Sequence, residues 1–85
     1  MTTELRRVYV KWIDSYGCTA RWEELDRDYP LLVIESIGFV ILNNDDVIAI
    51  ANSVSQETSK TPAQANGIMT IPKLSIIELN YLVNE

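Results

Sequence analysis

The chain has 85 residues, and its 12 acidic and 7 basic residues give a formal net charge of −5. A chain of this length forms one small domain, expected to span residues 1–85, with a thin hydrophobic core. The acidic balance disfavours nucleic-acid binding, because proteins that grip a phosphate backbone need clustered Lys and Arg.

Residue types that carry much of enzyme and metal chemistry are missing. The sequence has no His, the commonest general base and metal ligand. The single Cys18 cannot form an internal disulfide or a multi-Cys zinc site, and it has no His to activate it. The carboxylates do not follow the spacing of a calcium loop, and no Gly-rich phosphate loop is present. We expect a non-enzymatic protein without a metal or a cofactor.

The sequence also bears on where the protein acts. Residues 1–7 lack the basic and then apolar order of a signal peptide. No apolar run approaches the roughly 18 residues that a membrane-spanning helix needs. An unpaired Cys is typical of a reducing compartment. We expect a cytoplasmic protein with no membrane partner.

The first strand is predicted at residues 5–13. Val8, Val10 and Trp12 fall on one face of this segment at a period of two, which is typical of a half-buried strand. Residues 14–29 form an irregular segment, either a loop or a short helical turn.

A hairpin follows in the middle of the chain. Residues 31–42 carry apolar side chains at both odd and even positions, so both faces of the strand would be apolar. This pattern predicts a long, bent strand that turns each face toward the core at a different point. Gly38 in its middle predicts a bulge or a barrel corner. Residues 43–46, Asn-Asn-Asp-Asp, form a tight turn, and residues 47–54 return as a strand. One face of that returning strand is small and able to lie close to a ligand or another backbone: Ala49, Ala51 and Ser53.

The last third of the chain contains a long polar segment and two strands. Residues 55–67 have no apolar side chain larger than Ala, which predicts a long loop that is either functional or disordered. A short strand follows at residues 68–71 and ends at Pro72. Residues 73–75 are expected to form a tight turn or one turn of 3₁₀ helix, and residues 76–83 the last strand.

This order of elements resembles that of SH3-like and Sm-like small β-barrels. The resemblance is carried by Gly38, by the turn at 43–46 and by the strand–turn–strand unit at 68–79. It implies an all-β, five-stranded barrel with a loop or short helical turn after the first strand. The Arg-Gly pair that Sm proteins carry before their last strand is absent, so Sm-type RNA binding is not expected. Because so small a chain gains burial from neighbours, we expect a homo-oligomer.

Four short stretches resemble small uncharacterised proteins of bacteriophages and prophages. They are VKWIDS at 10–15, RW at 21–22, ESIGFV at 35–40 and GIMTIPK at 67–73. The resemblance implies a phage accessory protein that acts in the cytoplasm of a bacterial host. Such small accessory proteins often counter host defences, either by blocking a defence protein or by sequestering a nucleotide-derived signal.

The junction between the first strand and the irregular segment is the main candidate binding site. It gathers five candidate residues: Trp12, Asp14, Ser15, Arg21 and Trp22. An aromatic face would stack on a base, Arg21 would pair with a phosphate, and Asp14 would accept a hydrogen bond from a ribose hydroxyl or an amine. The alternative interpretation places Trp12 in the core and Trp22 over the end of the barrel.

A second candidate is an anion-binding rim formed by Asn52, Ser53 and Lys73, particularly where a neighbouring subunit faces them. In the alternative interpretation, Lys73 is solvated and protects a sheet edge.

Two functional hypotheses follow. The first is an anti-defence protein that sequesters a small nucleotide-derived ligand as a homo-oligomer. The alternative is a protein–protein interaction module, which inhibits a host defence protein or serves as a phage structural component and uses exposed sheet edges to add to a partner's strand.

Overall fold

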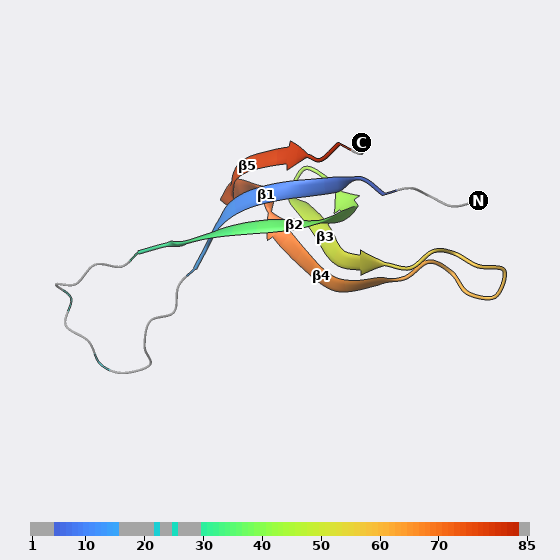
Figure 1. Ribbon diagram of the computed structural model, residues 1–85. Helices are drawn as coiled ribbons and strands as arrows, with labels where there is room; N and C mark the ends of the chain where they lie inside the picture. Colours follow the sequence, from blue (N-terminus) through green and yellow to red (C-terminus); the bar gives the residue numbers. More distant parts are fainter. Residues whose placement is uncertain (1–4, 16–21, 23–24, 26–29, 84–85) are drawn as a thin grey trace.

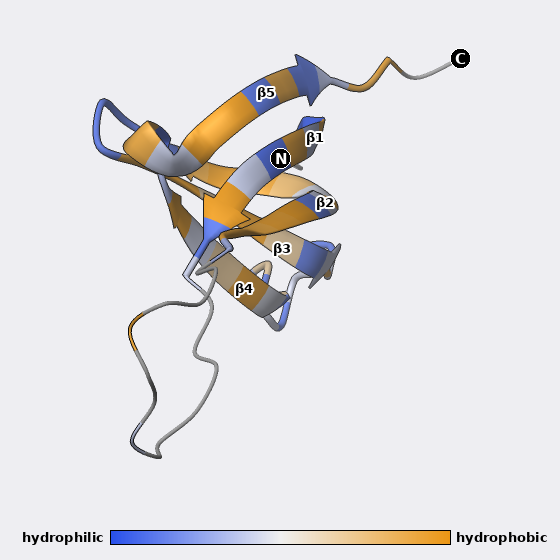
Figure 2. Ribbon diagram, turned by 90° about the vertical axis from the view of Figure 1, so that its left-hand side faces the viewer, coloured by the Kyte–Doolittle hydropathy of each residue, from blue (hydrophilic) through white to orange (hydrophobic). Residues whose placement is uncertain are grey.

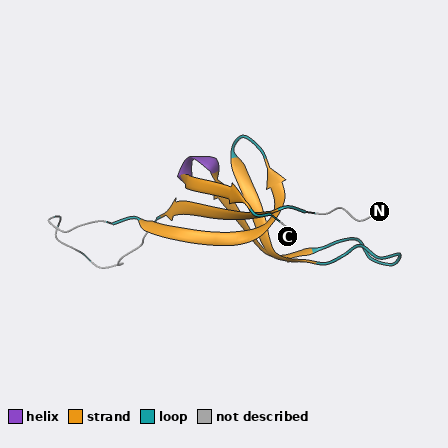
Figure 3. Ribbon diagram, turned by 45° about the horizontal axis from the view of Figure 1, so that its top comes forward, coloured by secondary structure: helices purple, strands orange, loops and turns teal. Residues whose placement is uncertain are grey.

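The computed structural model describes residues 5–15, 22, 25 and 30–83, and its strands form a single antiparallel sheet (Figure 1). The elements in chain order are β1 (Arg7–Asp14), β2 (Leu32–Asn43), β3 (Val47–Val54), β4 (Ala65–Pro72), η1 (Lys73–Ser75) and β5 (Ile76–Tyr81). The predicted all-β class, the strand at 47–54 and the 3₁₀ turn at 73–75 are confirmed. Strands account for nearly all the regular structure, as Figure 3 shows.

The strand order across the sheet is β4-β3-β2-β1-β5. β1 pairs with the central β2 from Arg7↔Phe39 to Asp14↔Leu32, and with β5 along its other side. Among the described strands no ladder joins β4 to β5, so the sheet is open and has two edges. The five-stranded part of the sequence prediction therefore holds, whereas closure into a barrel is not seen.

The core lies on one face of the sheet, which we call the inner face. Side chains alternate between the two faces along a strand, so the even-numbered residues at the centres of β1 and β3 share the inner face. Five buried residues form the cluster: Val8, Val10, Ile48, Ile50 and Ile71. Half-buried side chains pack around it: Trp12, Val40, Ile76, Leu79 and Tyr81. The buried residues of the cluster are few and come from β1, β3 and β4, which agrees with the thin core expected for this chain length.

The opposite, outer face of β2 differs from its prediction. Val33 is 51% exposed and Ile37 is 62% exposed, although both are large and apolar. Their cross-strand neighbours on β1 are Ile13 and Tyr9. The prediction that both faces of this strand turn inward is wrong, because no second layer of described residues covers the outer face.

Gly38 has a packing role rather than the predicted role of a bulge. It is buried and pairs in register with Val8. The register shift of β2 lies later, between Val40 and Leu42, where the strand meets β3. A Cβ at Gly38 would lie 2.9 Å from the carbonyl oxygen of Ala51. Gly at this position therefore lets the backbone of β3 approach closely.

The turn between β2 and β3 is held by one side chain, as its composition predicted. Asn44 Oδ1 accepts the backbone N–H groups of Asp46 and Val47, each at 2.9 Å. The Asn44 N–H donates to the carbonyl oxygen of Val47 at 3.1 Å. This local hydrogen bonding sets the register in which β3 returns along β2.

The connection between β3 and β4 is shorter than predicted. Residues 65–67 belong to β4, and the ladder with β3 begins at Val54↔Ala65. Gly67 has φ of +67°, and a Cβ there would lie 2.6 Å from Asn52 Nδ2. The sequence showed no strand signal at these positions because they carry small and polar side chains.

Candidate functional site

Trp12 belongs to the core more than to a binding surface. Its side chain is half-buried, packs against the inner-face cluster, and shares that face with Val8 and Val10. Its indole Nε1 donates to Ser36 Oγ at 3.1 Å. This hydrogen bond satisfies the only polar group of the indole, as expected for a Trp packed into a domain. The structure therefore supports the alternative interpretation of Trp12.

The other members of the predicted nucleotide site lie at the end of β1 and beyond it. Asp14 is the last residue of β1, and its Oδ1 accepts the N–H of Ser15 at 2.8 Å. The side chain of Trp22 is fully exposed. Arg21 lies outside the described residues, so its pairing with a phosphate stays a prediction.

The predicted anion rim does not assemble within one chain. Lys73 lies beside the start of β3, where Val47 pairs with Pro72 and the Lys73 N–H donates to the carbonyl oxygen of Asp46 at 2.8 Å. Ser53 lies six residues further along β3 than Val47, which is about 20 Å measured along the strand at about 3.3 Å per residue. Asn52 precedes Ser53, at this same far end. A shared rim would therefore need a second copy of the chain.

The far end of β3 leads into a polar hairpin, which we call the hairpin arm (residues 55–64). Figure 1 shows it projecting from the sheet on the side opposite the end of β1. The Ser55 N–H donates to the Gln64 carbonyl oxygen at 2.8 Å, and the Thr58 N–H to that of Thr61 at 2.9 Å. The Thr58 side chain also accepts the Thr61 N–H at 3.0 Å. The segment predicted as a loop is thus a hydrogen-bonded hairpin.

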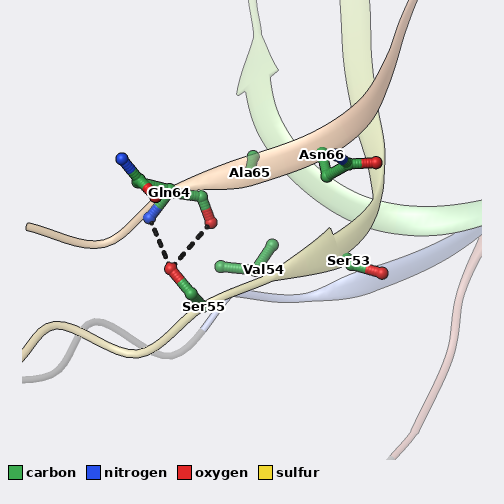
Figure 4. Close-up of a pocket in the computed structure, with 6 residues that line it drawn as sticks. All are labelled: Ser53, Val54, Ser55, Gln64, Ala65 and Asn66. Atoms are coloured by element: carbon green, nitrogen blue, oxygen red, sulfur yellow. Dashed lines mark hydrogen bonds between the residues drawn. The ribbon is translucent and has the colours of Figure 1, made fainter.

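An open pocket of about 320 Å³ lies at the root of the hairpin arm (Figure 4). Its lining residues are Ser53, Val54, Ser55, Gln64, Ala65 and Asn66. None of them is charged, and Ser55 Oγ already accepts the Gln64 N–H at 2.9 Å. A pocket of this composition has no cationic group that would form a charge-assisted pair with a phosphate. Of the predicted site residues only Ser53 contributes to it.

Polar residues occupy the part of the outer face that lies over β1 and β5. Tyr9 Oη donates to Glu35 Oε1 at 2.7 Å, and Lys11 lies between Glu35 and Glu78 in the ladder. The hydrogen bond to the Glu35 carboxylate raises the pKa of Tyr9 to about 12, with smaller effects from desolvation and from the charges of Glu35 and Glu78. These cross-strand pairs stabilise the sheet and leave Tyr9 protonated at neutral pH.

An apolar cluster occupies the rest of the outer face, over β2, β3 and β4. We call it the outer patch, and it consists of Ile37, Phe39, Leu42, Ala49, Ala51 and Ile68. The register carries it across the sheet, because Ala51 pairs with both Phe39 and Ile68. Ile37 is 62% exposed and Ile68 is 56% exposed, while Ala49 and Ala51 are buried among larger neighbours. Figure 2 shows hydrophobic residues recurring along these strands.

The outer patch was not recognised as a site from the sequence. The signal was present, since residues 31–42 are apolar at both parities. This apolar pattern also predicts a strand buried on both faces, which is the interpretation given in the sequence analysis. Only the arrangement of the strands shows that one of the two apolar faces is uncovered.

The described residues contain neither a metal-binding cluster nor a helix suited to cross a membrane. No group of three or more Asp, Glu or Cys residues is placed to hold a metal ion in this part of the chain. Among the same residues, no helix has the length and apolar character to cross a membrane. No protein-family model, curated protein or solved structure matches the chain.

Proposed function

We propose that this chain is a protein–protein interaction module that docks on a protein partner through the outer patch. The observation that carries the proposal is the exposure of Ile37, Leu42 and Ile68 together on one sheet face. Contiguous exposed apolar surface on a small soluble domain marks an interaction site. Because the chain carries a net charge of −5, the partner is expected to surround its own apolar surface with basic residues.

The setting of this proposal is a phage-infected bacterium. The four stretches that resemble phage proteins support an accessory role in the host cytoplasm. There the partner is a host defence protein that the module inhibits, or another component of the phage.

The proposal extends to the fold family and to assembly. Five antiparallel strands with a one-turn 3₁₀ link before the last strand support an SH3-like or Sm-like small barrel. The small number of buried residues supports a homo-oligomer, because a neighbouring subunit adds the burial that one chain lacks.

The test compares two variants that add the same negative charge at different places. Ile37→Glu places a carboxylate in the outer patch, and Gln56→Glu places one in the exposed hairpin arm. Tagged protein is used to capture partners from host lysate in high salt. A stoichiometric partner should be retained by the wild type and by Gln56→Glu and lost with Ile37→Glu. Equal retention by both variants would refute docking through the outer patch.

Sequestration of a nucleotide-derived ligand is the second candidate. The observation in its favour is the fully exposed indole of Trp22, which leaves an aromatic face free for stacking. Calorimetric titration of the wild type and of Trp22→Ala with cyclic nucleotides and cyclic ADP-ribose species tests it. Binding heat that disappears in Trp22→Ala supports sequestration, and the absence of heat with every ligand removes it.

A further inference from the structure

The open sheet presents two edge strands, β4 and β5, which differ in how they are protected. An edge strand exposes unpaired backbone N–H and C=O groups, and natural proteins protect such edges with charges, bulges and short strands. β5 has all three features: it is six residues long, it carries Glu78, and its register with β1 shifts between Lys11 and Trp12. At its end, Arg6 also stacks on the Tyr81 ring at 3.9 Å from the centroid.

β4 has almost none of this protection. It is eight residues long and contains no charged side chain. It keeps one register with β3 from Val54↔Ala65 to Val47↔Pro72. The two irregular positions are Gly67, whose φ is +67°, and the terminal Pro72, which has no N–H to donate. Figure 2 shows hydrophilic residues interrupting β5, and one of them is the charged Glu78, whereas β4 has no charged residue.

β4 exposes one large apolar side chain on each face of the sheet. Ile68, on the outer face, is 56% exposed, and Met69, which pairs with Ile50 on the inner face, is 40% exposed. An added strand beside β4 would cover both side chains and extend the thin core past Ile50. The edge therefore offers backbone hydrogen bonds and apolar burial at the same place.

The distribution of charge favours β4 over β5 as the edge at which two copies of this chain can pair. Two copies that each carry a net charge of −5 repel one another over most of their surfaces. A self-pairing contact is least unfavourable along a segment without acidic residues, and β4 is such a segment. β5 would instead bring its own Glu78 into any self-pairing contact.

We propose that β4 pairs antiparallel with β4 of a second copy about a two-fold axis, joining the two sheets into one. The same patch then serves both partners, as a two-fold interface requires. An axis perpendicular to the sheet keeps both outer faces on one side, so the two outer patches meet at Ile68. This inference goes beyond the docking proposal, because it assigns the β4 edge to a second copy rather than to another protein.

Two lysine variants test which edge associates. Thr70→Lys adds a charge to exposed Thr70 of β4, on the outer face opposite Ala49, where the ladder with β3 is preserved. Asn80→Lys adds the same charge on the outer face of β5. Light scattering should give twice the 9.7 kDa chain mass for the wild type and Asn80→Lys, and the chain mass for Thr70→Lys. Thermal unfolding checks that each variant is folded.

Three results of this experiment would overturn the proposal. The first is a wild type at the mass of one chain. The second is dissociation by Asn80→Lys but not by Thr70→Lys, which would assign the contact to β5. The third is a mass above two copies, which would indicate head-to-tail pairing of β4 with β5 instead of a two-fold contact.

Cross-linking provides a measurement that does not depend on disrupting the interface. In a Cys18→Ser background, single Cys residues are placed in turn at positions 66, 68, 69 and 70 and treated with a short bismaleimide. Because a two-fold axis brings one position of β4 opposite its own copy, at least one of these variants should give a covalent dimer in high yield. Asn80→Cys on β5 should not. Cross-linking of Asn80→Cys alone would refute the assignment.

The docking and self-pairing proposals fail separately. Ile37→Glu is expected to keep the dimer mass while losing the protein partner. Thr70→Lys is expected to become monomeric while each chain still carries its outer patch. A Thr70→Lys variant that stays dimeric overturns the β4 pairing, whatever the capture experiment shows.

Discussion

The two faces of the sheet carry similar residues in different environments. On the inner face, Val8, Ile48 and Ile71 are completely buried. On the outer face, Ile37 and Ile68 belong to the same residue class and are more than half exposed. The difference is whether other strands curl over the side chains, because the residues themselves have the same affinity for an apolar environment. Hydrophobic residues in a strand therefore do not by themselves indicate which face is covered.

The outer face is itself divided. Over β1 and β5 it carries polar residues, among which Tyr9 donates a hydrogen bond to Glu35 and Lys11 lies opposite Glu35 in the ladder. Over β2, β3 and β4 it carries the outer patch. The outer patch therefore lies beside the unprotected β4 edge, which it reaches at Ile68. Docking and self-pairing are thus proposed for adjoining surfaces.

The largest effect is expected from removing a buried side chain of the inner face. Ile48→Ala should lower the free energy of unfolding by about 2–5 kcal/mol, because the completely buried site loses apolar contacts and retains a cavity. Ile68→Ala makes the same change on the outer face and should cost much less. Urea unfolding of the two variants measures the difference, and equal losses would show that the two faces are equally covered.

A smaller effect is expected where β2 meets β3. Gly38→Ala should cost about 1–3 kcal/mol, because the new methyl group meets the Ala51 carbonyl oxygen at 2.9 Å and the backbone must move. Chemical unfolding measures the loss. An unchanged midpoint would mean that β3 is free to move away from β2 at this position.

Replacing an outer-patch residue by a polar one should have little effect on stability. Ile37→Ser is expected to change the free energy of unfolding of the isolated chain by no more than about 0.5 kcal/mol, since the side chain is already 62% exposed. Its effect should appear in partner capture instead. A strong loss of stability without loss of the partner would place Ile37 in the folding core and remove it from the docking surface.

The smallest effect concerns the polar part of the outer face. The pKa of Tyr9 is raised from 10.0 to about 12, so the stabilising contribution of the neutral phenol is complete below pH 10 and is lost as pH rises towards 12. Phenolate absorbance of the wild type minus that of Tyr9→Phe should show the late titration. Glu35→Gln should move the pKa of Tyr9 back towards 10, and an unchanged titration in that variant would contradict the assigned cause.

Local signals in the sequence predicted much of the fold. The period-two pattern of Val8, Val10 and Trp12 identified β1 and its buried face. The polar turn that contains Asn44 and the Pro at position 72 identified where strands end. These signals succeed because they depend on backbone conformation within a few residues.

The candidate site was less predictable. Trp12 was one residue of a possible nucleotide site, yet its hydrogen bond to Ser36 involves a different strand. Lys73 and Ser53 were grouped by chemistry, and the register of β3 with β4 places them far apart. Such groupings depend on pairing between distant segments, which residue types and local spacing do not specify.

The sequence by itself determined the all-β class, the approximate positions of the five strands and a core limited by chain length. Those features follow from side-chain alternation, turn chemistry and the ratio of surface to volume. The tertiary structure alone decided which face of β2 is covered, where β4 begins and which edge is unprotected. These depend on strand order and register, because a residue's burial is set by the strands that lie beside and above it.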